Sequence, residues 1–413
     1  MLKTFTIRQQ TAKIASVYAL GSGVVTVDET NKRQFFDLFK KRGADVNCMK
    51  TIDNTGDAGL EETIVNEKTK IVSETEIVNE KPSRLLLEGF AGDDYVYSLH
   101  SNHTLRFCAI SDYNTVLFEM PVNVLNFSNV LVLPVLEKNQ VGCFYIATVS
   151  TTDPDSFDMY FVNIINKTLN RLLKQVKYTE PELNFGNIMQ FEYLGDSRTI
   201  AVGYEDGSVY LFQMAKNFEK IESSNMLIHF PAMYNKDSDK ETECDHPLLS
   251  FAYSLDSSIL YMGHAKSNCI YSYETKTNRI KTTKHKKVLS VSNIAVLSDS
   301  KVLFLTWEHG SVYSLDFTTT ESKLHVIYTI PEKPNIQMVD IDPTGDTTVP
   351  HPFKAASRSY NKINILKVIP KEQLQKSYLD TTSKVLLKRY SHVITHDHVA
   401  LGLDSGVVII LQL

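Results

Sequence analysis

The chain has 413 residues, which is long enough to bury a large core as two or three ordinary domains or as one large repeat fold. Its net charge of −5 argues against nucleic-acid binding driven by overall charge, and its five scattered cysteines argue against a disulfide framework. Residues 1–10 lack the apolar core of a secretory signal, and 120–136, the longest uncharged run, are too short and too polar to span a bilayer. These features predict a soluble, intracellular protein.

Short alternating strands separated by turns recur along the chain at intervals of about 40 residues, which is typical of propeller blades. The predicted fold is therefore all-β: a single seven-bladed WD40-type propeller over 1–413. Residues 3–10 are predicted to supply the missing fourth strand of the last blade and to close the ring. An eighth, irregular blade within 335–370 is the alternative to a seven-bladed ring. The seven predicted blades are 10–55, 84–120, 121–178, 186–224, 246–284, 288–330 and 385–413.

The clearest unit is TIAVGYEDGSVYLFQM at 199–214. Apolar residues alternate on both sides of Asp206 and Gly207, which predicts two strands joined by a type I′ turn. A phosphate-binding loop would need a different glycine spacing that leads into a helix, whereas a strand follows here. Gly310 and Gly406 mark the corresponding turns of two later blades.

Three segments fit no strand pattern. The acidic segment 55–82 contains IVNEK twice, 225–245 is polar, and 332–382 contains five prolines. Solvated loops explain all three, but long loops on a rigid scaffold also often carry function. The sequence therefore predicts inter-blade insertions, with partner-binding elements as the alternative.

A basic run at 274–287 and the single tryptophan are the candidate partner-binding residues. The run could face an acidic partner, although a solvated outer strand is the usual fate of such a sequence. The tryptophan follows a predicted strand, where it either packs between blades or marks a binding hot spot. The candidates are Lys276, Arg279, Lys284, Lys286, Lys287 and Trp307.

Sequence motifs for catalysis or cofactor binding are not found. The chain contains no hydrolase, zinc-protease or kinase signature. His396 and His398 would share one face of a strand, which permits a metal pair, but two ligands do not make a closed site. The expected inner strands carry no repeated acid or histidine that a propeller enzyme would place in its channel. We therefore predict no catalytic residue, metal or cofactor.

The same stretches carry a family resemblance. AVGYEDGSVYLF at 201–212 resembles the blade motif of WD-repeat proteins. Within these, the sequence is similar to the ASTRA-associated protein 1 family of fungi and its animal relative, guanine-nucleotide-binding protein beta-like. Residues 121–130 resemble the start of that family's third blade, and 305–317 and 399–411 resemble its last two blades.

The resemblance implies a nuclear, non-catalytic scaffold that can also occur in the cytoplasm. It implies membership of an ASTRA-type assembly linked to chromatin remodelling and to the maturation of PI3-kinase-like proteins. The implied partners are the TTT cochaperone complex, RuvB-like ATPases and a PI3-kinase-like protein, with no membrane and no direct nucleic-acid contact. The alternative is a WD-repeat accessory subunit of a tRNA-modification or ubiquitin-ligase complex.

Overall fold

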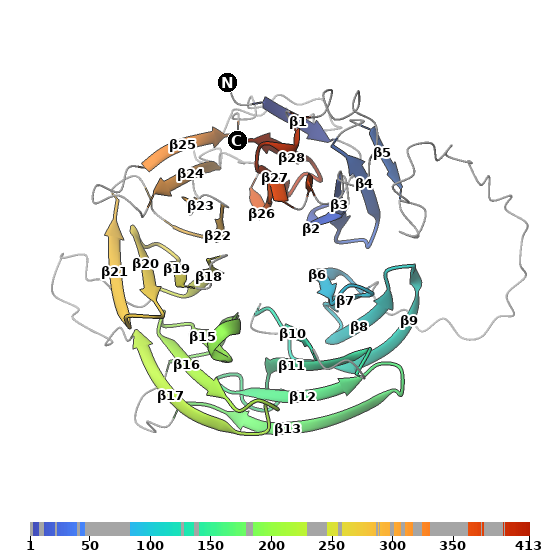
Figure 1. The fold of residues 1–413 in the computed structure, drawn as a ribbon, viewed down its shortest axis with the longest axis vertical. Helices are drawn as coiled ribbons and strands as arrows, with labels where there is room; N and C mark the ends of the chain where they lie inside the picture. Colours follow the sequence, from blue (N-terminus) through green and yellow to red (C-terminus); the bar gives the residue numbers. More distant parts are fainter. Residues whose placement is uncertain are drawn as a thin grey trace, which may run out of the picture.

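The chain folds as a ring of seven four-stranded antiparallel sheets in a computed structural model (Figure 1). The predicted all-β propeller is therefore confirmed. The structure describes residues 3–7, 12–20, 23–38, 42–45, 83–124, 128–135, 140–178, 185–228, 246–254, 258–285, 288, 290–297, 301–306, 310–316, 324–330, 362–372, 374–375, 391 and 393–413.

The first three blades follow one another in sequence, and each runs from an inner strand at the ring axis to an outer strand at the rim (Figure 1). Their strands are β2 (Ile14–Leu20), β3 (Gly23–Asp28), β4 (Arg33–Asp37) and β5 (Arg42–Asp45); β6 (Leu85–Ala91), β7 (Tyr95–His100), β8 (Thr104–Ala109) and β9 (Asp112–Pro121); and β10 (Leu131–Pro134), β11 (Cys143–Val149), β12 (Phe157–Asn163) and β13 (Thr168–Val176).

Blades 4 to 6 repeat this order, and the turn after β14 includes a short 3-10 helix, Gly195–Ser197. Their strands are β14 (Ile188–Leu194), β15 (Thr199–Tyr204), β16 (Val209–Met214) and β17 (Ile221–Ile228); β18 (Leu248–Tyr253), β19 (Ile259–His264), β20 (Cys269–Glu274) and β21 (Arg279–Lys284); and β22 (Asn293–Val296), β23 (Lys301–Leu305), β24 (Ser311–Asp316) and β25 (Leu324–Thr329).

Blade 7 closes the ring with strands from both ends of the sequence. It consists of β26 (Ile363–Ile369), β27 (His398–Leu403), β28 (Val408–Gln412) and, at its outer edge, β1 (Lys3–Ile7). β1 pairs antiparallel with β28, from Lys3 opposite Gln412 to Ile7 opposite Val408. The predicted closure by the N-terminal strand is thus observed, and it leaves no gap between the last blade and the first.

The inner strand of blade 7 differs from the expectation. Sequence reasoning placed the whole last blade at 385–413, whereas the structure takes its inner strand, β26, from before this range. β26 lies inside the range 332–382 that was assigned to an insertion, and it takes the part of 335–370 that could have formed an eighth blade. The pairing was missed because residues 370–397 separate β26 from β27, so proximity in sequence gave no indication of it.

The other predicted insertions lie mostly outside the described residues. The whole segment 55–82 lies outside the described residues. Of the segment 225–245, the structure describes only 225–228, which form the end of β17. Within 332–382, the described residues are those of β26 and a few that flank it.

Seven hydrophobic clusters hold the ring together, one at each seam between neighbouring blades. Each forms because alternate residues of a strand point to opposite faces of its sheet, and both faces of a blade are covered. The cluster between blades 3 and 4 is rich in aromatic rings, including Phe157, Phe191 and Phe212. Burial of apolar surface at the seams therefore stabilises the ring as one body.

The turn at Asp206 and Gly207 is a hairpin turn, as predicted, but of a different type. The N–H of Gly207 donates to the carbonyl of Tyr204 at 3.0 Å, and the N–H of Tyr204 donates to the carbonyl of Ser208 at 2.9 Å. Gly207 has φ +89°, whereas Asp206 has no positive φ. This is the three-residue loop of a type I turn followed by a left-handed glycine, because a type I′ turn needs positive φ at both central residues.

Candidate protein interface

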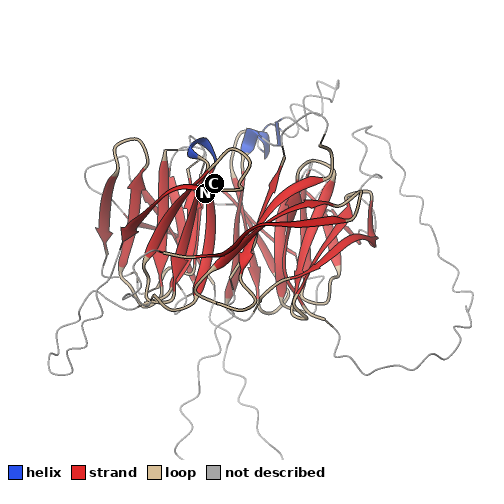
Figure 2. Ribbon diagram, turned by 90° about the horizontal axis from the view of Figure 1, so that it is seen from below, coloured by secondary structure: helices blue, strands red, loops and turns tan. Residues whose placement is uncertain are grey.

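Antiparallel strands place two kinds of connection on one face of the ring. These are the turn between the second and third strands of each blade and the link from each outer strand to the next blade. We call this side the turn face; the short helical segments lie on the opposite face (Figure 2). The strands β5, β17 and β25 end on the turn face, and the strands β6, β18 and β26 begin there.

Backbone hydrogen bonds fix the turn face from blade to blade. The N–H of Leu85 in blade 2 donates to the carbonyl of Glu29 in blade 1 at 2.9 Å, and the N–H of Ile188 in blade 4 donates to Pro154 in blade 3 at 3.0 Å. These turns are therefore held in place by their neighbours, which makes them a preorganised surface for binding.

Ion pairs across the links give the turn face a mixed charge pattern. Arg84 Nη1 lies 3.7 Å from Glu29 Oε2, and Lys13 Nζ lies 3.6 Å from Asp404 Oδ1. All four side chains are substantially exposed, so each pair adds less than about 1 kcal/mol to stability. Their main consequence is that positive and negative groups lie side by side on this surface.

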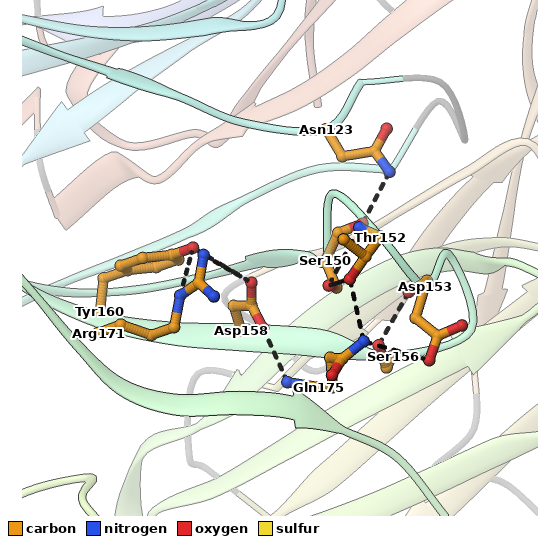
Figure 3. A network of polar contacts seen from close by, with 9 residues as sticks. All are labelled: Asn123, Ser150, Thr152, Asp153, Ser156, Asp158, Tyr160, Arg171 and Gln175. Atoms are coloured by element: carbon orange, nitrogen blue, oxygen red, sulfur yellow. Dashed lines mark hydrogen bonds and ion pairs between the residues drawn. The ribbon is translucent and has the colours of Figure 1, made fainter.

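Blade 3 carries an extended polar network on this face (Figure 3). Gln175 has φ +50° at an irregularity in the β12–β13 pairing, and its N–H donates to Asp158 Oδ1 at 2.8 Å. The Asp158 side chain is almost fully buried. A buried carboxylate must be hydrogen-bonded, so the left-handed backbone at Gln175 is held there by a specific acceptor.

Tyr160 and Arg171 complete the surroundings of Asp158. The Tyr160 hydroxyl donates to Asp158 Oδ2 at 3.1 Å, and Arg171 Nε donates to the Tyr160 oxygen at 3.1 Å (Figure 3). The guanidinium of Arg171 also lies 5.3 Å from the centre of the Tyr160 ring. Burial and the nearby Asp158 charge raise the pKa of Tyr160, so the phenol stays a hydrogen-bond donor.

The second half of the network fixes the turn at 150–156. The Gln175 side-chain amide donates to Thr152 Oγ1 at 3.0 Å, and Asn123 Nδ2, in the link from blade 2, donates to the carbonyl of Ser150 at 2.9 Å. Lys177 Nζ lies 3.6 Å from both Asp153 Oδ2 and Asp155 Oδ2. The result is a rigid polar projection, which suits recognition of another protein surface.

The predicted basic residues lie elsewhere. Arg279 and Lys284 lie at the two ends of β21, the outer strand of blade 5, and Lys276 is in the turn before it; all three are exposed. Lys276 and Arg279 lie toward the opposite face and Lys284 at the turn-face end of β21, but blade 4 separates all three from the blade 3 network. Lys286, Lys287 and Trp307 lie outside the described residues.

The predicted turn residues have structural roles. Gly310 and Gly406 have φ of +55° and +75°, as Gly207 does in its own turn, and this conformation is strained for side chains with a Cβ. Asp206 accepts hydrogen bonds from the N–H and the hydroxyl of Ser208, both at 2.8 Å. The geometry of the turns explains why these residue types occur at these positions, so a ligand is not needed to account for them.

The two histidines considered for a metal pair do not share a strand face. His396 is exposed and precedes β27, whereas His398 is the buried first residue of that strand. Among the described residues, no group of three histidine, cysteine or carboxylate side chains could hold a metal ion. No helix within the described ranges is long and apolar enough to cross a membrane.

Sequence reasoning missed the Asp158 network. Asp158 follows a buried phenylalanine in an ordinary strand pattern, and the residue that it holds, Gln175, gives no glycine signal for a positive φ. The contacts that define the network cross from one strand to the next, so no local pattern marks them.

Comparison with known proteins agrees with this architecture. No protein-family model matches the chain. The chain is 29% identical to ASTRA-associated protein 1 of Komagataella phaffii, over 49% of this chain and 44% of that protein. It is 20% identical to ASTRA-associated protein 1 of Lachancea thermotolerans, over 57% of this chain and 56% of that protein. The chain thus spans about half the length of the curated relatives it matches.

The crystal structure of Sqt1 from Saccharomyces cerevisiae, a WD-repeat protein, shows the same fold. It superimposes with a TM-score of 0.52 at 9% identity and covers 99% of this chain and 98% of Sqt1. At this identity the likeness concerns the fold alone. The resemblance predicted from the blade motifs is therefore confirmed: the chain is a seven-bladed propeller that is similar in sequence to proteins named ASTRA-associated protein 1.

Proposed function

We propose that this protein is a non-catalytic scaffold subunit of an ASTRA-type assembly. The observation that carries the proposal is its sequence similarity to two proteins named ASTRA-associated protein 1. The propeller supports it, because a closed ring offers two faces and a rim on which several proteins can be held at once.

A more specific proposal concerns the partner proteins and the cellular location. We propose that the protein works in the nucleus, where it connects chromatin remodelling with the maturation of PI3-kinase-like proteins. The partners would be the TTT cochaperone complex and RuvB-like ATPases. The preorganised turn face, with its mixed charges and the rigid projection of blade 3, is the surface that we assign to this contact.

Affinity purification of the tagged full-length chain from its own cells, with mass spectrometry of co-purifying proteins, tests the proposal. We expect TTT components, RuvB-like ATPases or a PI3-kinase-like protein. Recovery of a tRNA methyltransferase or a cullin without any of these would overturn the proposal in favour of an accessory subunit of another enzyme complex.

Two matched variants of blade 3 test the assigned surface. Lys177→Glu reverses an exposed charge on the turn face, and Lys167→Glu reverses an exposed charge on the opposite face of the same blade. We expect the first to reduce co-purification severalfold and the second to leave it unchanged, with equal thermal stability of both. If only Lys167→Glu reduced co-purification, the interface would have to lie on the opposite face.

A further inference from the structure

The inner strands of the ring place a separated acid and base at the axis. β6, β14 and β26 are each seven residues long, and each has a register shift between its first and third residues. Their fifth residues, Gly89, Glu192 and Lys367, therefore occupy equivalent positions of the repeat. In each blade, this residue pairs with the residue of the second strand that lies three positions before that strand ends: Tyr97, Ala201 and Ala400, respectively. One turn of the ring thus carries a carboxylate and an ammonium at the same level.

Both charged groups face the axis. Lys367 is exposed and Glu192 is only partly buried, although each lies on the innermost strand of its blade, where neighbouring blades cover both faces of the sheet. Although solvent reaches both side chains, the surrounding blades keep them away from bulk water, which raises the pKa of Glu192 to about 7 and lowers that of Lys367; the charge of each partly offsets the shift of the other. Both side chains thus belong to the axial lining of the ring.

A tyrosine adds a third polar group at this level. A Cβ on Gly89 would lie 2.6 Å from the Tyr97 hydroxyl oxygen, so the glycine gives Tyr97 the space to cross the inner strand. Burial and the charge of Glu192 raise the pKa of Tyr97 to about 12, which keeps its hydroxyl protonated. Ala252, at the equivalent position of β18, has the smallest side chain after glycine. Tyr18, at the equivalent position of β2, is buried and donates its hydroxyl hydrogen bond to Glu88 of blade 2.

The acid and the base do not satisfy each other. In the described part of the chain no ion pair joins Glu192 to Lys367, and the carboxylate accepts a hydrogen bond from the backbone N–H of Tyr193 at 3.3 Å. Charges held away from bulk water are stabilised best by direct opposite charges. A molecule with an ammonium group at one end and a carboxylate at the other supplies both.

We propose that Glu192 and Lys367 bind a small zwitterion of the amino-acid class at the axis of the ring. Its ammonium group would contact Glu192, with Tyr97 beside it, and its carboxylate would contact Lys367. This site is independent of the partner-binding surface proposed above, because it lies inside the ring and not on the turn face.

A series of amino acids of increasing length tests the proposal and measures the separation of the two charges. Isothermal titration of the purified full-length chain with glycine, β-alanine, 4-aminobutanoate and 6-aminohexanoate at pH 8 gives the affinity of each. Butylamine and butanoate, which carry one charge each, are the controls. We expect one zwitterion to bind at least tenfold more tightly than both controls. Equal binding of zwitterions and controls, or no binding, would overturn the proposal.

Variants at the two charges separate binding from folding. Glu192→Gln and Lys367→Met should each weaken the best zwitterion at least tenfold, whereas Glu222→Gln and Lys174→Met on outer strands should not. If a variant is unstable, Glu192→Asp keeps the charge and should shift the preferred length upward. Unchanged affinity and unchanged length preference in folded variants would exclude the site.

The pH dependence gives a further readout. The ammonium contact needs the ionised form of Glu192, which faces Tyr97 and Lys367, so affinity should rise as the pH increases through about 7. Glu192→Gln should lack this rise. A rise of equal size in that variant would show that another group controls binding and would remove Glu192 from the site.

Discussion

The seams between blades 1 and 2 and between blades 3 and 4 hold the ring together by different means. In the first, the buried side chain of Arg33 forms an ion pair with the fully buried carboxylate of Glu88. Tyr18 donates to Glu88 Oε1 at 2.9 Å, Ser16 Oγ donates to the Glu88 carbonyl at 2.8 Å, and Arg33 lies 4.4 Å from the centre of the Tyr113 ring. The polar contacts are thus directional and mutually dependent.

The seam between blades 3 and 4 is apolar, and half of the buried residues of its cluster are aromatic. Phe157 meets Phe191 and Phe212 edge to face, with ring centres 5.9 and 5.3 Å apart, and Tyr178 and Tyr204 extend the cluster. Apolar packing tolerates small shifts, whereas an ion pair with fixed hydrogen bonds does not. We infer that the polar seam specifies how blade 2 docks against blade 1, and that the aromatic seam supplies stability.

The largest expected effect comes from breaking the polar seam on one side. Glu88→Ala leaves Arg33 buried without its counter-charge and should lower the free energy of unfolding by about 3–5 kcal/mol. Urea denaturation measures it. Glu119→Ala, which removes the exposed partner of Arg106, should cost less than about 1 kcal/mol.

Replacing both partners tests whether the seam serves specificity. Arg33→Met combined with Glu88→Leu should return stability to within about 1–2 kcal/mol of the wild type, because no charge remains buried. A double variant as unstable as Glu88→Ala would show that the ion pair itself provides net stability.

A third seam, between blades 4 and 5, combines the two types and predicts a dependence on pH. His264 is buried, its Nε2 lies 2.9 Å from the carbonyl of Gly207, and burial lowers its pKa to about 4. The unfolded chain binds the proton at about pH 6.5, so His264 destabilises the fold as the pH falls from 6.5 to 4, by on the order of 3 kcal/mol.

His264→Asn should remove most of this loss when stability is compared at pH 7 and pH 4. The buried His100, whose pKa burial also lowers to about 4, leaves part of the dependence in place. The exposed His103→Asn serves as the control and should change neither value. An unaltered pH profile in His264→Asn would contradict the assignment.

The aromatic seam should respond to a smaller change in shape. Phe212→Leu keeps the site apolar but loses the edge-to-face contact with Phe157, so we expect a loss of about 1–2 kcal/mol. The matched change Phe161→Leu, at a partly exposed ring, should cost less. Similar losses of stability at both positions would show that ring packing in the seam contributes no more than ring packing at a partly exposed site.

The smallest effect distinguishes the two seams most directly. Tyr18→Phe removes a hydrogen bond to Glu88 and should cost about 1 kcal/mol. Tyr204→Phe in the aromatic seam should be neutral or slightly stabilising, because its buried hydroxyl has no hydrogen-bond partner among the described residues. Differential scanning calorimetry of both variants decides the comparison; a destabilising Tyr204→Phe would place a polar contact in that seam.

The hairpins, most blade boundaries and the closing N-terminal strand could be predicted from sequence. Each depends on alternation at period two and on turn residues such as Gly207, which act over a few residues. β26 could not be predicted as part of blade 7, since its partner follows only after a long connection. The basic residues of β21 were predicted as exposed cations, but their distance from the blade 3 network was not readable from their spacing.

By itself, the sequence determined the class of fold, the number of blades and the family to which the chain is similar. Only the tertiary structure decided which side chains meet. The Arg33–Glu88 pair, the Asp158 network, and the Glu192 and Lys367 charges at the axis all join residues from different strands or blades. The physical reason is that strand patterns are set by neighbours along the chain, whereas burial and charge pairing depend on neighbours in space.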